Sequence, residues 1–265
     1  MSDANARLRA LADHLFEVFS RHTDPDAALL AGSVAKGEAD ELSDIDLLIY
    51  HADLPSDEAV AAARDEVGAT DLKVIAPRTE AGLLDQFTVG GVTCQVGQIA
   101  ISDVEHDIRK GVVDLDPDAF TMKALGGLHD GLPLAGNDLI AGWRTAATYS
   151  DDLQRTIVAR HWKVVPLWKL TAHVAARDAE LWRHQILVDG AYDLLAVLAA
   201  TNRVWFSSFQ FKRTRTLTGR LEVAPPDLPD RLEALFTLPP EASAQELERL
   251  TDETRAILEA RRLLP

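Results

Sequence analysis

The spacing of apolar residues predicts the first four elements of the chain. Residues 5–21 carry apolar side chains at helical spacing, which is typical of an amphipathic helix. Apolar runs at 26–32 and 44–51 predict two buried strands, and the segment between them has room for one helical turn and a loop. An alanine-rich stretch at 55–68, with Ser56 in the N-cap position, predicts a second helix.

Three further strands are expected before the pattern changes. Residues 71–76 form one short apolar run, and residues 85–89 and 92–101 form two more on either side of Gly90 and Gly91. Because two consecutive glycines readily form a tight turn, the last two runs are expected to pair as a hairpin.

The second half of the chain is mainly helical in pattern. Helical spacing dominates residues 151–217, and another helix is expected at 244–263. We therefore expect an α/β domain of the α+β kind over residues 1–135 and an all-helical domain over residues 136–265.

Composition limits the classes of protein that this chain can belong to. A length of 265 residues with 47% hydrophobic and 26% charged residues suits a soluble protein of two modest domains. The net charge of -15 disfavours a nucleic-acid partner, because binding to phosphate backbones needs excess Lys and Arg. The single cysteine, Cys94, excludes an internal disulfide. The sequence contains no apolar run of about 18 residues, which a membrane span requires, so we expect no contact with a membrane. We expect a cytoplasmic protein.

The most informative stretch is "LLAGSVAKGEADELSDIDLLIYH", residues 29–51. In a strand, Asp44 and Asp46 point to the same face, while Ile45 and Leu47 point to the other face and into a core. Two carboxylates so close repel each other unless a cation lies between them. Oxygen ligands of this kind suit Mg²⁺, which shares its shell with water and substrate phosphates.

Gly32 and Ser33 supply the complementary chemistry. A glycine lets the backbone approach a ligand closely, and N–H groups beside a hydroxyl can bind an anion. Taken singly, Asp44 could cap a strand, Asp46 could be an ion-paired edge residue, and a Gly-Ser pair could form an ordinary turn. Their combination favours a site that binds phosphate next to a metal ion.

The stretch "AGSVAKGEADELSDIDLLIY" resembles the nucleotidyltransferase superfamily typified by DNA polymerase beta. The resemblance implies a nucleotidyltransferase fold, in which a small mixed sheet is flanked by helices. Within the superfamily, the chain is most similar to aminoglycoside and lincosamide nucleotidyltransferases with a helical C-terminal domain. A weaker similarity lies in "LLAVLAATNRVWFSSFQFKRTRTL", which matches a segment of related bacterial members.

The resemblance implies a reaction and a role for each motif residue. Asp44 and Asp46 would hold Mg²⁺ that bridges a nucleoside triphosphate, with ATP the expected donor, and Gly32 and Ser33 would bind its β- and γ-phosphates. A hydroxyl of a small molecule, an antibiotic among the candidates, would attack the α-phosphorus and release pyrophosphate. A homodimer is compatible with this expectation.

The chain departs from the family pattern at a third position. Members usually add a carboxylate on a later central strand, and the corresponding position here holds Gln95. An amide oxygen can coordinate a cation, but it cannot take a proton at neutral pH. Three interpretations stay open: the strand is aligned out of register, another group acts as base, or the protein binds nucleotide without transferring it.

Several groups could replace the missing base, although their spacing singles out none of them. Asp103, Glu105 and His106 follow the strand that contains Gln95, and Asp151 and Asp152 begin the helical region. Each is more typical of a helix cap or a solvated helix charge than of a base. The helical region also contains His161, His173 and His184, whose spacing does not match a zinc pair and which we interpret as structural.

Basic residues are scarce, so those of the helical region are candidate phosphate ligands. Lys212, with Arg213 and Arg215 beside it, could bind the triphosphate, and so could Lys163 and Lys169. The alternative is a solvated helix end. The acidic remainder would suit a cationic acceptor, and it would equally serve solubility.

Two functions from different classes therefore remain. The first is an Mg²⁺-dependent nucleotidyltransferase that acts on a small-molecule hydroxyl. The second is a catalytically degenerate protein of the same fold, which binds nucleotide or a partner as an antitoxin or regulator, and Gln95 is the residue that favours it.

Overall fold

The structure is a computed structural model, and it describes residues 3–163 and 177–265. The chain divides into two compact units, Met1–Asp116 with Ala124–Thr148, and Pro117–Lys123 with Tyr149–Pro265. The expected boundary at residue 135 lies inside the first unit, because the helix over residues 137–146 packs on the sheet of that unit. No helix in the described ranges is long and apolar enough to cross a membrane.

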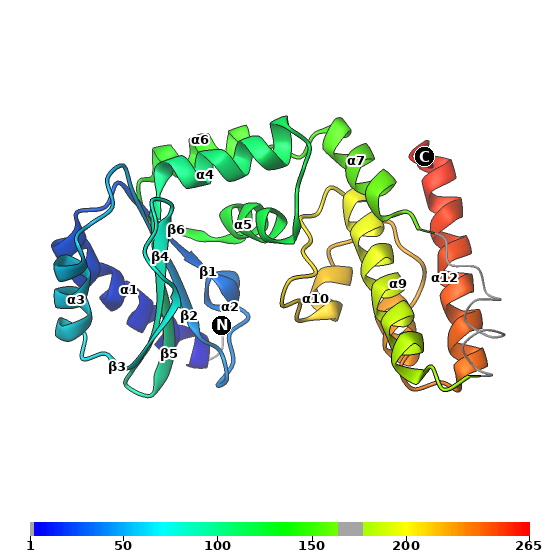
Figure 1. The fold of residues 1–265 in the computed structure, drawn as a ribbon, viewed down its shortest axis with the longest axis horizontal. Coiled ribbons are helices and arrows are strands. Elements are labelled where there is room, and N and C mark those ends of the chain that lie inside the picture. The colour runs from blue at the N-terminus through cyan, green and yellow to red at the C-terminus, as the bar shows by residue number, and fades with distance from the viewer. Residues whose placement is uncertain (1–2, 164–176) are drawn as a thin grey trace. The chain divides into compact units, whose positions relative to one another are not determined.

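The first unit is built on a six-stranded mixed sheet with the order β3-β4-β5-β2-β1-β6 (Figure 1). Strands β2 and β5 are parallel, and every other neighbouring pair is antiparallel. The expected α+β fold with a small mixed sheet is confirmed. The strands are β1 (Ala27–Ala31), β2 (Ile45–His51), β3 (Thr70–Ala76), β4 (Gly82–Val89), β5 (Val92–Ala100) and β6 (Leu132–Ala135).

Helices flank this sheet (Figure 1). Helices α1 and α3 lie side by side against one face, where Phe19 of α1 and Val60 of α3 join the core. Ile45, Leu47 and Ile49 of β2 are fully buried in the same core. The helices of this part of the chain are α1 (Asp3–Thr23), α2 (Gly32–Lys36), α3 (Asp57–Glu66), α4 (Ile101–Ile108), the π-helical turn η1 (Arg109–Val113), α5 (Ala119–Asp130) and α6 (Asn137–Ala146). The first turn of α5 belongs to the second unit.

The alternation of β2 decides which side chains face away from this core. Since successive residues of a strand point to opposite faces, the burial of Ile45 and Leu47 directs Asp46 to the other face of the sheet. Asp44 precedes Ile45 by one residue and continues the same alternation. The sequence pattern thus fixes the face on which the two carboxylates lie.

Local signals in the sequence correspond to local structure. The Ser56 hydroxyl accepts a hydrogen bond from the Ala59 N–H at 3.2 Å and caps α3. Gly90 and Gly91 have φ values of 57° and 81° between the paired strands β4 and β5. Positive φ at both central residues is what a type I′ hairpin turn requires, so the expected hairpin is confirmed.

Strand β6 was not expected, because the sequence around it reads as a turn. It is only four residues long and contains Pro133, which lacks the N–H that strand pairing uses. At the edge of the sheet only one side of a strand is paired, and there proline is tolerated.

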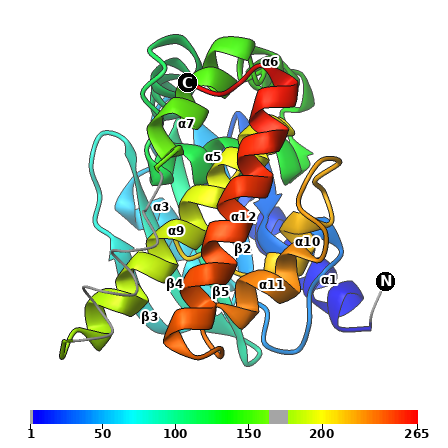
Figure 2. The ribbon, with the colours of Figure 1, turned by 90° about the vertical axis from the view of Figure 1, so that its right-hand side faces the viewer.

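The described residues of the second unit form helices and loops. Helix α9 packs against both α7 and α12, and Figure 2 shows α9 and α12 side by side. Leu187, Leu194 and Leu198 of α9 lie in the core of this unit. The helices are α7 (Asp151–His161), α9 (Glu180–Thr201), α10 (Thr214–Thr218), α11 (Leu228–Ala234) and α12 (Pro240–Arg261).

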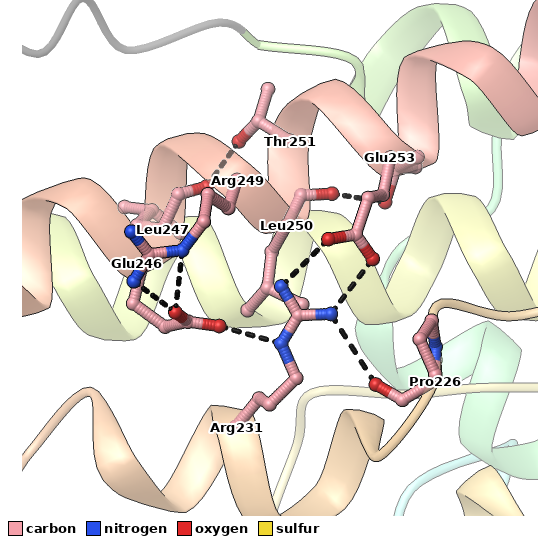
Figure 3. Close-up of polar contacts among 9 residues, drawn as sticks. Pro226, Arg231, Glu246, Leu247, Arg249, Leu250, Thr251 and Glu253 are labelled. Carbon is pink, nitrogen blue, oxygen red and sulfur yellow. Dashed lines mark hydrogen bonds and ion pairs between the residues drawn. The ribbon is translucent and has the colours of Figure 1, made fainter.

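An arginine on α11 ties this helix to α12 (Figure 3). Arg231 donates to Glu253 at 2.7 and 2.9 Å and to Glu246 at 2.5 Å. Arg249 donates to the other oxygen of Glu246 at 2.9 Å. Burial alone would raise the pKa of Glu246, but the hydrogen bonds from Arg231 and Arg249 outweigh it and lower that pKa. These charged hydrogen bonds connect α11 to α12 and are partly shielded from water.

Candidate functional site

Three oxygen-bearing side chains meet on two neighbouring parallel strands. Asp46 of β2 is the Cα partner of Gln95 on β5, and Asp44 lies directly before β2. The Gln95 amide nitrogen donates to Asp44 Oδ2 at 3.4 Å, which is a long hydrogen bond. All three residues are half-buried. Asp44, Asp46 and Gln95, predicted as catalytic residues, are therefore neighbours in space and remain accessible to a ligand.

Gly32 lies directly against one of these carboxylates. It has φ of +67°, and a Cβ built on it would collide with Asp46 Oδ2. Both the backbone conformation and the lack of space favour glycine at this position. Ser33 is the next residue in α2, and Ala31, the residue before Gly32, is the β1 partner of Asp46. The predicted phosphate-binding pair thus lies beside the carboxylates.

The donor set suits a hard divalent cation. Two carboxylates and an amide carbonyl provide oxygen ligands, and half-burial leaves room for water or phosphate oxygens to complete the shell. Across the residues that the structure describes, no group of three or more His, Cys, Asp and Glu is arranged to hold a metal. Gln95 stands where a third carboxylate would complete such a group, so the residues fit Mg²⁺ with two charged ligands from the protein.

The residue beside Gln95 lies on the opposite, core-facing side of β5. Cys94 is fully buried in the core, and its thiol faces apolar residues. Burial, reinforced by the nearby negative charge of Asp44, raises the pKa of Cys94 to about 12. The thiol is therefore protonated at neutral pH, and it serves packing rather than nucleophilic chemistry.

The three candidate substitute bases of the first unit lie away from this site. Asp103, Glu105 and His106 lie on α4, which begins where β5 ends. Ala100, the last residue of β5, is five residues beyond Gln95, which corresponds to roughly 16 Å along a strand. Asp103, Glu105 and His106 therefore lie beyond the C-terminal end of β5, away from Gln95.

The remaining two candidates belong to the second unit. Asp151 forms an ion pair with Arg203, and Asp152 lies 3.7 Å from Arg155 at the start of α7. Acidic side chains at a helix N-terminus interact favourably with the helix dipole, and a role of Asp151 or Asp152 as base stays a prediction.

The predicted phosphate ligands of the helical region also lie in the second unit. Lys163 Nζ is 3.9 Å from Asp193 Oδ2, and Lys212 is exposed in the loop before α10. Arg215 is engaged by Asp230 at 2.6 Å and by Glu233 at 2.8 Å. Lys169 lies outside the described residues. Binding of triphosphate by Lys163, Lys169 and Lys212 stays a prediction.

Sequence reasoning missed one polar pair in the second unit. His161 Nδ1 lies 2.8 Å from Asp193 Oδ1, so the histidine at the end of α7 is paired with a carboxylate on α9. The two residues are 32 positions apart, and each lies in an unremarkable helical pattern. The sequence carries no local signal from which this pairing could be found. His184 bonds the backbone of its own helix, as expected for a structural histidine, and His173 lies outside the described residues.

Comparison with known families identifies the N-terminal segment. Residues 13–85 match the family model described as polymerase beta, nucleotidyltransferase. The matched segment contains Gly32, Ser33, Asp44 and Asp46, and it ends before Gln95. No curated protein gives a significant match to the chain.

Among solved structures, the chain is similar to several nucleotidyltransferases. A nucleotidyltransferase-like protein from Exiguobacterium sibiricum 255-15 is 8% identical with a TM-score of 0.41, over 94% of this chain and 74% of that one. Cid1 in complex with its short product ApU is 16% identical with a TM-score of 0.31, over 74% of this chain and 51% of Cid1. A cytoplasmic RNA terminal U-transferase is 15% identical with a TM-score of 0.32, over 81% and 55% of the two chains. This chain spans about half the length of the latter two proteins. The segment over residues 13–85, which is less than half of the chain, is therefore similar to nucleotidyltransferases of the polymerase beta family.

Proposed function

We propose that the protein is an Mg²⁺-dependent nucleotidyltransferase that transfers a nucleoside monophosphate, from ATP in the first instance, to a hydroxyl group of a small molecule. The arrangement of Asp44 and Asp46 on one face of β2, beside Gly32, is the observation that carries the proposal. It lies within the segment that matches the nucleotidyltransferase family.

Each residue of the site has a role in this proposal. Asp44 and Asp46 would hold the metal ion, which when bound neutralises charge that builds up on the phosphates during transfer. Gly32 leaves space next to Asp46 that any side chain would fill, and Ser33 offers a hydroxyl and a backbone N–H to phosphate oxygens. Gln95 would hold Asp44 in place through its amide N–H and offer its carbonyl oxygen to the cation.

The transfer itself requires a balanced exchange of bonds. The acceptor oxygen forms a bond to the α-phosphorus while the bond between that phosphorus and pyrophosphate breaks, and the hydroxyl proton must leave. Gln95 cannot receive this proton, because a neutral amide is not a base at physiological pH, so in this proposal the proton passes to solvent water at the half-exposed site. The net charge of -15 favours a small neutral or cationic acceptor over a nucleic acid.

A second candidate function is favoured by the same residue. With Gln95 in place of a third carboxylate, the site could bind nucleotide without transferring it, and the protein would then act as a nucleotide-dependent regulator or antitoxin. The two functions share the binding site and differ in turnover.

Transfer of a label separates these candidates. The protein is incubated with Mg²⁺, each nucleoside triphosphate labelled at the α-phosphate, and a small-molecule extract or short RNAs as acceptor. The proposal expects label on a small molecule with the wild type and none with Asp44→Asn. The matched control Asp65→Asn removes an exposed carboxylate on α3 and keeps activity.

The other outcomes have defined meanings. Label on RNA would contradict the proposed acceptor class. If the triphosphate binds and no acceptor is labelled, the second candidate function is favoured. If label is transferred equally by Asp44→Asn, the proposed site is wrong.

A further inference from the structure

A row of polar side chains crosses four strands of the sheet in the first unit. Asp46 on β2 is the Cα partner of Gln95 on β5. Gln95 is in turn the partner of Gln86 on β4, and Gln86 is the partner of Lys73 on β3. Side chains that are directly opposite each other on neighbouring strands point to the same face of a sheet. The row therefore begins at a proposed metal ligand and ends at a cation on the edge strand.

The burial of neighbouring residues fixes the face on which this row lies. Phe87 and Cys94 are buried in the core that α1 and α3 cover (Figure 1). Each is the direct sequence neighbour of one glutamine of the row, so Gln86 and Gln95 point to the opposite face. Both glutamines are half-buried, and Lys73 is exposed. Within the described ranges, the Gln86 amide and the Lys73 ammonium form no hydrogen bond or ion pair.

The glutamines and their neighbours offer hydrogen bonds to a polar molecule. A primary amide both donates and accepts, so the Gln86 side chain matches a peptide group or a hydroxyl. Gln95 uses one amide N–H for Asp44 and keeps the other. Thr88 and Thr93 are paired across β4 and β5, two residues from the glutamines, and add hydroxyls on the same face. A ligand that lies across β4 and β5 can therefore be bonded at several points.

Lys73 adds one positive charge at the far end of the row. Neighbouring strands are about 4.8 Å apart, so three spacings place the Cα atoms of Asp46 and Lys73 roughly 14 Å apart. The nearest carboxylate in sequence, that of Asp71, accepts a hydrogen bond from Thr70 Oγ1 at 3.1 Å. Lys73 can thus compensate one negative group of a ligand, whereas the net charge of -15 disfavours a polyanion. A ligand with one anionic group and one amine has no net charge and meets both conditions.

We infer that this face of the sheet binds the acceptor, and that the acceptor is a small hydroxylated zwitterion of the kind that a serine-containing peptide represents. Its hydroxyl would lie at Asp46. Its amide groups would bond to Gln86 and Gln95, and its carboxylate to Lys73. An extended tripeptide is about 10 Å long, and the side chains at the two ends of the row cover the remaining distance. This inference rests on the proposed function, because it names the class of molecule that receives the nucleotide.

Ligand-observed NMR on the full chain, without nucleotide or metal, tests the inference. The probes are the tripeptide Ser-Gly-Gly and its C-terminal amide, which differ only in the carboxylate. Lys73→Met removes the cation of the row, Lys73→Arg keeps it, and Gln86→Leu removes the amide. The matched controls are Arg9→Met on α1, which covers the other face of the sheet, and Gln185→Leu on α9 of the second unit.

We expect the tripeptide to bind the wild type, Lys73→Arg and both controls alike. Lys73→Met should bind it about threefold more weakly, because an exposed ion pair is lost. The amide should bind the wild type as weakly as the tripeptide binds Lys73→Met, and Lys73→Met should not weaken the amide further. Gln86→Leu should weaken both probes about threefold or more, because it removes hydrogen bonds that both can form.

The outcomes separate this inference from the proposed function. Asp44→Asn/Asp46→Asn should bind the tripeptide at least as tightly as the wild type in the absence of metal, whereas label transfer tests the carboxylate site by itself. The inference is overturned if the tripeptide does not bind the wild type, if it binds all variants equally, or if Lys73→Met weakens the amide as much as the tripeptide.

Discussion

Asp46 and Gln95 occupy opposite positions on the parallel strands β2 and β5, and the Gln95 amide donates to the neighbouring Asp44 at 3.4 Å. A third carboxylate at Gln95 would complete an acidic triad around one cation. The amide replaces a negative charge by a neutral oxygen, and it converts a repulsive contact with Asp44 into a hydrogen bond. The site therefore carries two negative charges rather than three when no metal is bound.

Gln95→Glu should increase the affinity of the site for Mg²⁺. A third carboxylate adds attraction to the cation, and we expect roughly tenfold tighter binding, about 1.4 kcal/mol. Calorimetric titration with Mg²⁺ measures this, with Gln185→Glu as a control that adds the same charge on α9. Equal affinities in wild type and Gln95→Glu would show that residue 95 is not near the cation.

Gly32→Ala and Gly37→Ala separate backbone strain from collision with Asp46. The φ values of the two glycines are +67° and +73°, so an alanine should cost each about 1 kcal/mol of unfolding free energy. A Cβ at residue 37 meets no atom within 4 Å, whereas one at residue 32 collides with the Asp46 carboxylate. Urea unfolding should show a larger loss for Gly32→Ala, and only this variant should lose Mg²⁺-dependent nucleotide binding. Normal binding by Gly32→Ala would contradict the close approach.

Cys94 should be unreactive in the folded protein. With a pKa of about 12, almost none of its thiol is thiolate at about pH 8. A water-soluble disulfide reagent should label it slowly in buffer and rapidly in urea. Rapid stoichiometric labelling of the native protein would contradict the burial of this side chain.

The same thiol predicts a pH dependence of stability. Its pKa is higher in the folded state than in the unfolded chain, where it is near 8.5, so the folded state binds the proton more tightly. The stabilisation is complete below the unfolded pKa and declines as the pH rises through the window up to about 12. The difference in unfolding free energy between wild type and Cys94→Ala should therefore shrink above about pH 8.5. A difference that is constant through this range would refute the shift.

Arg231→Ala should destabilise the second unit. Its guanidinium bonds two carboxylates on α12, and its side chain is 19% exposed, so loss of these bonds should cost about 2 kcal/mol. Arg215→Ala is the control, because Arg215 pairs with exposed carboxylates and its loss should change little.

The same network predicts a pH dependence of stability. Since the pKa of Glu246 is lowered in the folded state, the stabilisation by the network is fully present above the pKa that Glu246 has in the unfolded chain. This stabilisation should be lost as the pH falls through the lower pKa of the folded state. Urea titrations of both variants measure these differences.

The sequence predicted the parts of the fold and site that depend on local pattern. Alternation in β2 was enough to direct Asp44 and Asp46 away from the core, and Ser56 and Gly90 marked a helix start and a hairpin turn. Strand β6 was not predicted, because it contains Pro133, which a strand tolerates at the edge of a sheet. Which strand lies at the edge depends on how all strands pair, and the local sequence does not reveal this.

The second unit shows what local pattern cannot reveal. His161 and Asp193 meet across two helices, and the buried Tyr149 hydroxyl has no hydrogen-bond partner among the residues that the structure describes. Each residue by itself fits an ordinary helix or helix boundary. Such features depend on contacts between distant segments, and a single sequence holds no direct record of them.

The most direct test of the account is a calorimetric titration with a non-hydrolysable ATP analogue, with and without Mg²⁺, on the wild type and on Asp44→Asn/Asp46→Asn. GTP, CTP and UTP analogues follow in the same format, and Asp53→Asn/Asp65→Asn is the matched control. We predict that one analogue binds only with Mg²⁺, that the control variant binds it normally, and that the Asp44→Asn/Asp46→Asn variant does not bind it. Binding that is independent of metal and of both carboxylates, or no binding of any analogue, would contradict the assignment of this site.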